Sequence, residues 1–317
     1  MTNKIRDTIK SIKIVYITYK AIMAFKHRLT MFLLMKISPV FASKYYFKRT
    51  TGKKLNLKNP VLFNEKCRWL NLYWQNPLVA ACADKYEVRS YIEECGYPEI
   101  LNELYGVYED VIEIEWNNFP QKYVIKCTHG NKFNIFCTDK NKFDTSEAEL
   151  LLKKWIVVDY RLIAAEMHCN IIKPRIICEK YIETKQGVFP NDYKMYCFKG
   201  KVHCTVVCSL RYTGQIKYAM YDKQWKNKLP YITDSFLIHK DFKKPISYDK
   251  MIEIAERISF PFPFVRVDFY ETDDGEPIFG EMTFTPAGCR SKEHTEIALR
   301  EMGDMIILPK KYNNNWF

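Results

Sequence analysis

The stretch FVRVDFYETDDGEPIFGEMTF, residues 264–284, decides the fold of this chain. Two runs of alternating apolar and polar residues flank ETDDGE, a cluster typical of a tight turn. Successive side chains on a strand point to opposite faces, so Arg266 shares a face with Asp268, and Glu281 shares a face with Thr283. Pairing the two runs through their turn predicts an antiparallel hairpin with Asp268 and Glu281 on one face.

Two carboxylates held a few ångströms apart repel each other unless a cation lies between them. All-oxygen ligands on a rigid sheet suit Mg²⁺, which commonly takes one or two carboxylates plus substrate phosphates. Arg266 beside them can meet phosphate oxygens. The alternative at this point is a hairpin whose charged face is simply in contact with water.

Short strands alternate with helices along the rest of the chain. Apolar runs bounded by turn residues predict strands at 123–127, 134–138, 175–182, 192–198 and 202–210. Helical spacing and capping residues predict helices at 63–73, at 84–95, from a capping box at Ser146 and Glu149 to about Cys169, and at 247–259. Hairpins mixed with helices predict an α+β fold with antiparallel sheet.

Among the charged residues of these predicted strands, Lys126, Glu179 and Lys194 are candidate site residues. Lys126 follows an apolar pair, and a central strand rarely carries a lysine without a reason. Its ammonium suits a nucleotide phosphate, or else the strand is an edge strand and the side chain reaches out to water. Glu179 either accepts hydrogen bonds from a nucleotide or faces solvent. Lys194 adds a cation on an alternating strand.

The composition is that of a folded protein, and its charge is concentrated at one end. Hydrophobic residues make up 47% and aromatic residues 15% of the 317 positions, which excludes a mostly disordered or collagen-like chain and allows about two domains. The eleven cysteines form no CxxC pair and fit no zinc spacing, so we interpret them as small apolar residues in a reducing compartment. No Rossmann or Walker glycine motif is present.

Residues 1–54 form a basic arm. Ten lysines and three arginines stand against the single acid Asp7, so the arm accounts for the whole net charge of +12. Basic and apolar residues interleave over 9–36, which suits a helix on an anionic membrane surface or a helix packed on the body with its charges outward. A lysine and a proline break the best apolar stretch, Leu29 to Ser43, before it could span a membrane. The neutral body argues against nucleic acid as a partner.

In this order, the motifs resemble the ATP-grasp superfamily, specifically its TupA-like branch from bacterial surface-polysaccharide and teichuronopeptide gene clusters. The resemblance runs from about residue 60 to 309 through PVLFNEKCRWLNLY, ADKYEVRSYI, YVIKCTHGNKFNIF, KPRIICEKYIE, DYKMYCFKGKVH, FPFVRVDFYETDDGEPIFGEMTFTPAG and GDMIILP. It implies an ATP-grasp-like α+β fold in which two subdomains with antiparallel sheets clasp a nucleotide. The expected units are a basic helical arm (1–55), a helical subdomain (56–118), a small ATP-grasp subdomain (119–183) and a C-terminal subdomain with the metal site (184–317).

The resemblance also implies ATP and Mg²⁺ as cofactors. Lys126 would touch the α- and β-phosphates, and Thr283 stands where the superfamily often has a third, asparagine ligand. Residue by residue, the implied set is Lys126, His129, Gly130, Lys132, Glu179, Lys180 and Tyr181 for the nucleotide, Asp268, Glu281 and Thr283 for the metal, and Arg266 and Lys194 for catalysis.

One loop departs from the branch. After the lysine strand the branch usually carries a sequence close to NHGSGGN, whereas residues 128–134 here read THGNKFN. Two glycines are missing, so fewer backbone N–H groups can approach a triphosphate closely. Lys132 would supply a charge instead; the alternative is weakened nucleotide binding. His129 is interpreted as loop packing or a helper donor. Similarly, TPAGC (285–289) stands where the branch often has FPGSG.

The implied activity is that of an ATP-dependent carboxylate–amine ligase of bacterial cell-surface polysaccharide biosynthesis. A carboxylate attacks the γ-phosphorus, and an amine then displaces phosphate from the acyl phosphate to give an amide. The implied partners are a carboxylate-bearing sugar or peptide and an amine donor, in the cytoplasm or at the inner face of the plasma membrane through residues 1–54, with no nucleic acid. The alternatives are a glycosyltransferase-like enzyme using a nucleotide sugar and a non-catalytic nucleotide-binding scaffold.

Overall fold

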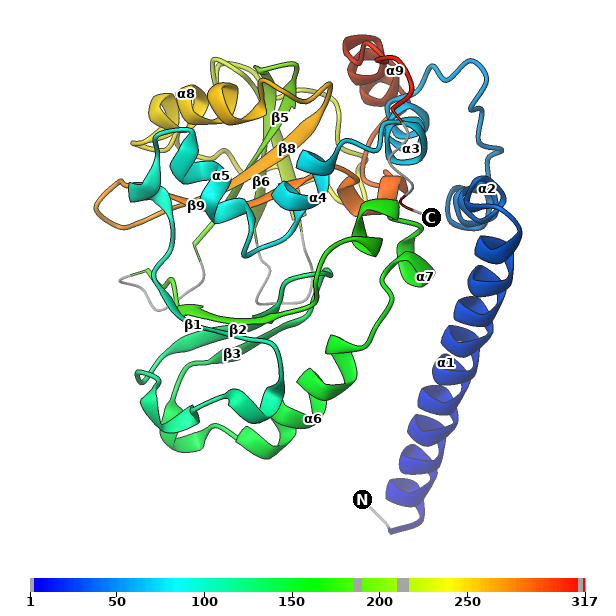
Figure 1. Ribbon diagram of the computed structural model, residues 1–317, viewed down its shortest axis with the longest axis vertical. Coiled ribbons are helices and arrows are strands. Elements are labelled where there is room, and N and C mark those ends of the chain that lie inside the picture. Colours follow the sequence, from blue (N-terminus) through cyan, green and yellow to red (C-terminus); the bar gives the residue numbers. More distant parts are fainter. Residues whose placement is uncertain (1–2, 185–189, 210–216, 313–315, 317) are drawn as a thin grey trace.

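Two antiparallel sheets, one below the other, dominate the molecule, and helices surround them (Figure 1). The computed structural model describes residues 3–184, 190–209, 217–312 and 316. The smaller sheet has the order β1-β4-β2-β3 and the larger β7-β6-β5-β8-β9. The predicted α+β class is thereby confirmed.

The strands and helices have the following bounds. The strands are β1 (Leu104–Tyr108), β2 (Tyr123–Cys127), β3 (Asn134–Cys137), β4 (Ile176–Lys180), β5 (Asp192–Phe198), β6 (Lys201–Ser209), β7 (Lys217–Asp222), β8 (Val265–Glu271) and β9 (Pro277–Thr283). The helices are α1 (Asn3–Ile37), α2 (Pro39–Thr51), α3 (Phe63–Tyr73), α4 (Pro77–Ala83), α5 (Val88–Glu94), α6 (Thr145–Ile156), α7 (Arg161–Ala164), α8 (Tyr248–Ser259) and α9 (Glu296–Met305).

The smaller sheet separates an apolar face from a polar one. In β2 the side chains of Tyr123, Ile125 and Cys127 enter a core that Leu152 of α6 completes. The alternate position, Lys126, points to the opposite face, as the strand period of two requires. Because β2 lies between β4 and β3, the alternative that Lys126 stands on an edge strand is wrong.

The larger sheet also has an apolar face and a polar face. On its back, Met195 of β5 and Val267 of β8 pack against the buried side of α8, which carries Met251, Ile254 and Ala255. All of these side chains are fully buried. The polar alternate positions of β5, β8 and β9 therefore face the smaller sheet, and this fixes where charged chemistry can occur.

Two predicted helices differ from the structure. The helix predicted over 84–95 begins only at Val88, as α5, because Asp84 is the C-cap of α4 and its carboxylate accepts hydrogen bonds from the N–H groups of Tyr86 and Glu87. Asn76 and Pro77, an N-cap and a first-turn proline, are the signal for α4 that the pattern missed.

The helix predicted from Ser146 to Cys169 is also too long. Asp144 is its N-cap and accepts a hydrogen bond from the N–H of Glu147, and the helix ends at Ile156. Val157 and Val158 follow at once, and consecutive β-branched residues disfavour continuation of a helix. In contrast, α3 and the predicted hairpins lie where the pattern places them, although Leu210, the end of one predicted strand, is outside the described residues.

The basic arm is helical. Helix α1 runs along one side of the molecule with its N-terminal end away from the body, and α2 folds back beside α3 (Figure 1). Within the described residues, none of the helices combines the length and apolar character needed to cross a membrane. All eleven cysteines are free thiols and nine of them are buried, which agrees with their interpretation as small apolar residues.

Candidate active site

The floor of the candidate site is the hairpin of β8 and β9. Asp268 and Glu281 are direct partners in its register, so the predicted pairing of the two carboxylates is confirmed. A β-bulge follows Asp268, and Gly280 lies opposite it. A Cβ atom at Gly280 would lie 2.9 Å from the carbonyl oxygen of Asp268, so this close approach of the two strands requires glycine.

A guanidinium occupies the space between the two carboxylates. Arg266 donates from Nε and Nη2 to the two oxygens of Asp268, each at 2.6 Å, and from Nη2 to Glu281 Oε1 at 3.1 Å. The same Nη2 lies 3.0 Å from the hydroxyl of Thr283. The cation predicted between the carboxylates is therefore, in this structure, a side chain of the same strand.

Lys194 of β5 brings a second cation to Asp268. Its Nζ lies 2.5 Å from Asp268 Oδ2 and 3.5 Å from Asp192 Oδ2. Burial disfavours the ionised form of Asp268, but Arg266 and Lys194 outweigh it and lower the pKa of the carboxyl. Burial likewise opposes the charge of Lys194, yet Asp268 and Asp192 raise its pKa. All three groups are therefore charged at neutral pH.

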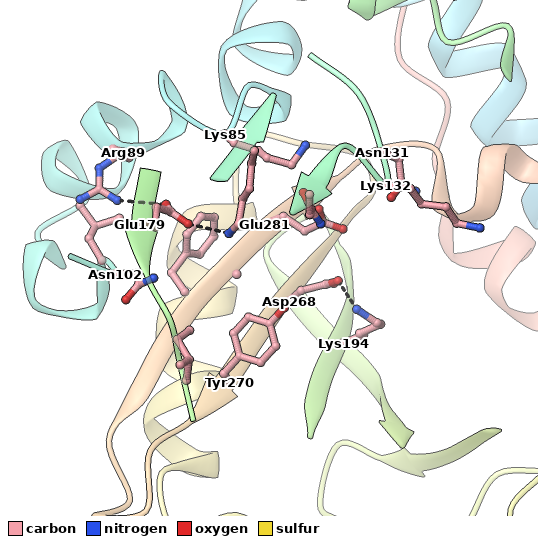
Figure 2. Close-up of a pocket in the computed structure, with 16 residues that line it drawn as sticks. Lys85, Arg89, Asn102, Asn131, Lys132, Glu179, Lys194, Asp268, Tyr270 and Glu281 are labelled. Atoms are coloured by element: carbon pink, nitrogen blue, oxygen red, sulfur yellow. Dashed lines mark hydrogen bonds and ion pairs between the residues drawn. The ribbon is translucent and has the colours of Figure 1, made fainter. Parts of the chain in front are cut away.

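The roof of the site belongs to the smaller sheet and the segment before it. Lys126 Nζ lies 2.5 Å from Glu179 Oε2, and Arg89 approaches the other oxygen of Glu179 at 3.7 Å. Lys85 donates to the carbonyl oxygen of Gly130 at 2.6 Å. Figure 2 shows Lys85 and Arg89 on one side of the space, Asp268 and Lys194 on the other, and Glu281 between them.

A cleft of about 810 Å³ separates roof and floor. An apolar cavity of about 1,020 Å³ adjoins it, shares Lys126 and Tyr270 with it, and is lined by Val124, Phe136 and Tyr181. A third cavity adjoins the other end of the cleft and shares Lys85 and Glu281 with it. The series therefore offers an apolar chamber, a strongly charged middle and a polar far end.

All twelve predicted site residues line these three adjoining cavities. Lys180 and Tyr181 are in the apolar one, together with Lys126, which also reaches the middle. The charged middle holds Lys126, Lys132, Glu179, Lys194, Asp268 and Glu281. The far end holds His129, Gly130, Arg266, Glu281 and Thr283. His129 and Gly130 thus lie beyond the middle cleft, beside the far end of the floor.

Sequence reasoning missed Lys85, Arg89, Tyr270 and Glu166. Lys85 and Arg89 are four residues apart in ADKYEVRSYI, a spacing that places two cations on one side of a helical segment, and this signal was available. Glu166 follows α7, in a stretch that the sequence predicts as the end of a long helix, so nothing in the pattern directed it toward the hairpin.

Lys132 adopts a backbone conformation suited to glycine. Its φ angle is +66°, in the left-handed region, at a position where the resemblance expects glycine. Phe133 beside it is buried and stacks on Trp155, which holds the loop in place. The loop therefore keeps a turn of the glycine type and adds an exposed ammonium at the edge of the cleft.

Of the two carboxylates on the floor, Glu281 is more accessible to Mg²⁺ than Asp268. Glu281 is 39% exposed and turns toward the cleft, whereas Asp268 is 2% exposed and already accepts from two cations. Carboxylate and hydroxyl oxygens are the ligand types that Mg²⁺ prefers. An ion between Asp268 and Glu281 therefore requires Arg266 to turn away from them.

Glu166 is the buried carboxyl group of the far cavity. Burial, with a smaller contribution from Glu281, raises its pKa to about 7, against the opposing effects of Arg68, Thr285 and Lys85. The side chain is 15% exposed, and His168 Nε2 lies 3.9 Å from Oε2. Burial lowers the pKa of His168 to about 4, so this imidazole is neutral at pH 7.

Comparison with known proteins identifies a family. The model of the TupA-like ATPgrasp family matches residues 65–307, about three-quarters of the chain. No curated protein matches the sequence.

Among solved structures, similar chains include the ATP-grasp ligase PsnB complexed with a phosphomimetic variant of its minimal precursor, Mg and ADP. It has 10% identity and a TM-score of 0.41 over 74% of this chain and 60% of its own length. The D-cycloserine synthetase DcsG has 14% identity and a TM-score of 0.42 over 72% and 70% of the two chains. The D-alanine–D-alanine ligase from Bacillus anthracis has 14% identity and a TM-score of 0.39 over 76% and 67%.

Replacing Asp268 tests the buried charge cluster. Asp268→Asn leaves two buried cations facing an amide, and we expect a loss of about 3–5 kcal/mol in the free energy of unfolding, measured by urea denaturation. Adding Lys194→Met should recover part of this loss. Asp249→Asn, which removes an exposed partner of Lys244, should cost about 0–1 kcal/mol. Equal losses at the two aspartates would contradict the arrangement.

The pKa of Glu166 makes stability depend on pH. Because folding raises this pKa from the ordinary 4.5 to about 7, ionisation of Glu166 opposes folding progressively as the pH rises between these values. Glu166→Gln cannot ionise, so its melting temperature relative to the unmodified protein should rise from acid to mildly alkaline pH. The charged and polar groups that surround Glu166 are Tyr46, Arg68, Lys85, Tyr160, His168, Cys169, Glu281 and Thr285. A pH-independent difference would show that Glu166 ionises normally.

Proposed function

The chain belongs to the TupA-like ATP-grasp family, and on this premise we propose that it is an ATP-dependent ligase that joins a carboxylate to an amine. One observation carries the proposal: a single cleft receives lysines and an arginine from its roof and paired carboxylates from its floor. Such a site supplies positioning and charge stabilisation, which is what phosphoryl transfer chiefly requires of a protein. In this proposal residues 119–183 carry the roof, together with Lys85 and Arg89 of residues 56–118, and residues 184–317 carry the floor.

ATP would lie along the series of cavities. Its adenine suits the apolar chamber beside Tyr181, with Lys180 and Glu179 at the adjoining strand. Its phosphates suit the charged middle, where Lys126, Lys85 and Lys132 provide ammonium groups. Lys126 would exchange its partner Glu179 for phosphate oxygens, and Arg89 remains beside Glu179 to balance the carboxylate.

Asp268 and Glu281 would hold Mg²⁺, with the hydroxyl of Thr283 beside them. The ion supplies screening of the phosphate charge when it is bound. Arg266, displaced from between the carboxylates, would then bind an oxygen of the transferring phosphate, for which a guanidinium is well suited. Lys194 stays on Asp268 and keeps that carboxylate oriented.

The reaction would follow from this arrangement. A substrate carboxylate attacks the γ-phosphorus, ADP leaves, and an acyl phosphate forms. The amine nitrogen then attacks the carbonyl carbon, the bond from that carbon to the phosphate oxygen breaks, and amide and phosphate are released. Arg266 stabilises the phosphate oxygens in both steps, because it lies at the far end of the floor where the γ-phosphate would stand.

The finer role is a proposal from the family resemblance: assembly of a bacterial cell-surface polysaccharide or capsule, with a carboxylate-bearing sugar or peptide as acceptor. Such acceptors are carried on lipid, which would place the enzyme at the inner face of the plasma membrane. The arm supports this placement because α1 exposes large apolar side chains among its basic residues, namely Val15, Tyr16, Ile17, Tyr19, Ile22, Phe25, Leu29, Phe32, Leu33 and Ile37.

Nucleotide binding tests the proposal before any substrate is known. Lys126→Ala should weaken binding of a non-hydrolysable ATP analogue with Mg²⁺ about ten- to a hundredfold, because a charged hydrogen bond to phosphate is lost. Lys122→Ala removes a neighbouring, exposed lysine paired with Glu183 and should leave the affinity unchanged. Glu281→Gln should abolish the Mg²⁺-dependent formation of ADP. Equal affinity in the two lysine variants would contradict the site.

The measurement of ADP separates the functions. A ligase releases ADP only when a carboxylate and an amine are both present. Turnover of a UDP-sugar without ATP would indicate a glycosyltransferase. Nucleotide binding without turnover, unchanged by Asp268→Asn, would indicate a scaffold.

Cosedimentation with vesicles tests the membrane placement. The protein should bind vesicles of phosphatidylcholine and phosphatidylglycerol, bind pure phosphatidylcholine less, and dissociate as salt is raised, because the arm is basic. Phe25→Asp with Leu29→Asp should abolish binding. Ile112→Asp with Ile246→Asp, which change exposed apolar residues elsewhere, should not. Equal binding by both double variants would exclude the arm as the anchor.

A further inference from the structure

A fourth cavity, which we call the arm cleft, opens between the N-terminal arm and the body. It has a volume of about 1,160 Å³ and is bounded by α1, α2, α7, the loop at residues 131–133 and the 3₁₀ turn Pro286–Cys289. It shares Asn131, Tyr160, Glu166 and Ala287 with the far cavity of the candidate site. A molecule could therefore reach the floor of the site from the arm side, opposite to the nucleotide chamber.

The wall that the arm supplies is fixed in place. Tyr46 of α2 is buried, and the guanidinium of Arg68 lies 4.8 Å from the centre of its ring. A Cβ atom at Gly288 would lie 2.8 Å from the Tyr46 hydroxyl, so α2 rests directly on the 3₁₀ turn. His27 of α1 lies 3.2 Å from the carbonyl oxygen of Ile163 in α7. The C-terminal part of the arm is thus built into the cleft.

The arm cleft is lined by side chains of both charges. Glu166 lines it where it meets the far cavity, and it is the one carboxylate that lines both spaces among the described residues. Arg49, Lys132 and Arg290 line it as well and are exposed. In the part of the chain that the structure describes, none of these three cations forms an ion pair; Arg49 donates to the Tyr45 hydroxyl and Arg290 to the carbonyl of Ala287.

We propose that the arm cleft binds the amine substrate, with its ammonium group at Glu166 and its carboxylate groups at Arg49, Lys132 and Arg290. This rests on the proposed ligase function and names the class of amine: one that carries at least one carboxylate, such as an amino acid. A carboxylate entering first would meet Glu166, and an amine without carboxylates would leave the exposed cations unused. A zwitterion that enters with its ammonium group first pairs that group with Glu166 and its carboxylates with the exposed cations.

The position of Glu166 suits the second step of the reaction. The amine nitrogen can attack the acyl phosphate only after its ammonium has lost a proton, and Glu166 is the carboxylate beside the far end of the floor that is not engaged with Arg266. The proton passes from the ammonium to Glu166 as the nitrogen lone pair becomes available. His168 and His129, whose pKa values are lowered by burial, are weaker bases at the same cavity.

Four small molecules test the proposal by calorimetric titration into the full chain saturated with a non-hydrolysable ATP analogue and Mg²⁺. L-Aspartate carries an ammonium and two carboxylates, succinate lacks the ammonium, L-alanine lacks one carboxylate, and ethylamine lacks both. L-Aspartate should bind at least tenfold more tightly than succinate or ethylamine, with L-alanine between them. Succinate binding as tightly as L-aspartate, or no binding by any of the four, overturns the proposal.

Variants then test separately the carboxylate and the cations that line the arm cleft. Glu166→Gln should lower the affinity for L-aspartate at least tenfold and leave that for succinate unchanged. Arg49→Gln with Arg290→Gln should bring L-aspartate to the affinity of L-alanine or below. The matched control is Lys26→Gln with Lys44→Gln, which removes the same charge from exposed positions of α1 and α2 outside the cleft and should have no effect. Equal effects of the two double variants would overturn the proposal.

The nucleotide titration in the same samples keeps the two proposals apart. If the ATP analogue fails to bind, the proposed ligase function fails. If the analogue binds and the arm-cleft variants leave L-aspartate affinity unchanged, the ligase function stands and the assignment of the arm cleft is wrong.

Discussion

The carboxylate of Asp268 is the group on which the candidate site depends. It is buried, it accepts from Arg266 and Lys194 at once, and the contact with Lys194 joins β8 to β5. Arg266 extends this network to Glu281 of β9. Burying one anion with two cations is tolerable only when the geometry satisfies all three, and removing any member leaves an uncompensated charge. The cluster therefore fixes the floor while leaving Glu281, which is more exposed, able to meet a ligand. A buried inner carboxylate beside a more exposed outer one is what the proposed exchange of the guanidinium for a metal ion requires.

Much of this floor could be predicted, because strand periodicity is a local property. The alternation around Asp268 and the turn at 272–275 sufficed to predict the register partner Glu281. The occupant of the space between them could not be predicted, since Arg266 satisfies the carboxylates only through side-chain geometry that spacing does not encode. The prediction of helix ends failed for a related reason. The carboxylate of Asp84 forms hydrogen bonds that compete with continuation of the helix, and a hydrophobic pattern does not reveal such bonds.

The basic arm combines an exposed apolar surface with a surface that packs on the body. Its sequence indicates either a membrane helix or a helix packed on the body, and the structure gives α1 both a side with exposed apolar residues and an end that packs against α7. The exposed apolar side was accessible to sequence reasoning because charge and hydropathy can be read from the residues themselves. The inward side was not, because Tyr46 and Arg68 meet only after the chain has folded across 22 positions and stacked on the turn at Gly288.

In the glycine-poor loop at residues 128–134, a side chain takes the place of backbone N–H groups as the source of positive charge. A glycine-rich loop binds phosphates with closely approaching N–H groups, and its flexibility must be lost on binding. Here Lys132 keeps the left-handed turn, at a cost of order 1 kcal/mol, and Phe133 locks the loop against Trp155. The loop is thus held by its own packing, and its charge comes from an ammonium that lines both the charged middle cleft and the arm cleft. In the proposed function, a lysine at this junction would lie beside both the nucleotide and the amine substrate and supply a charge that a run of glycines lacks.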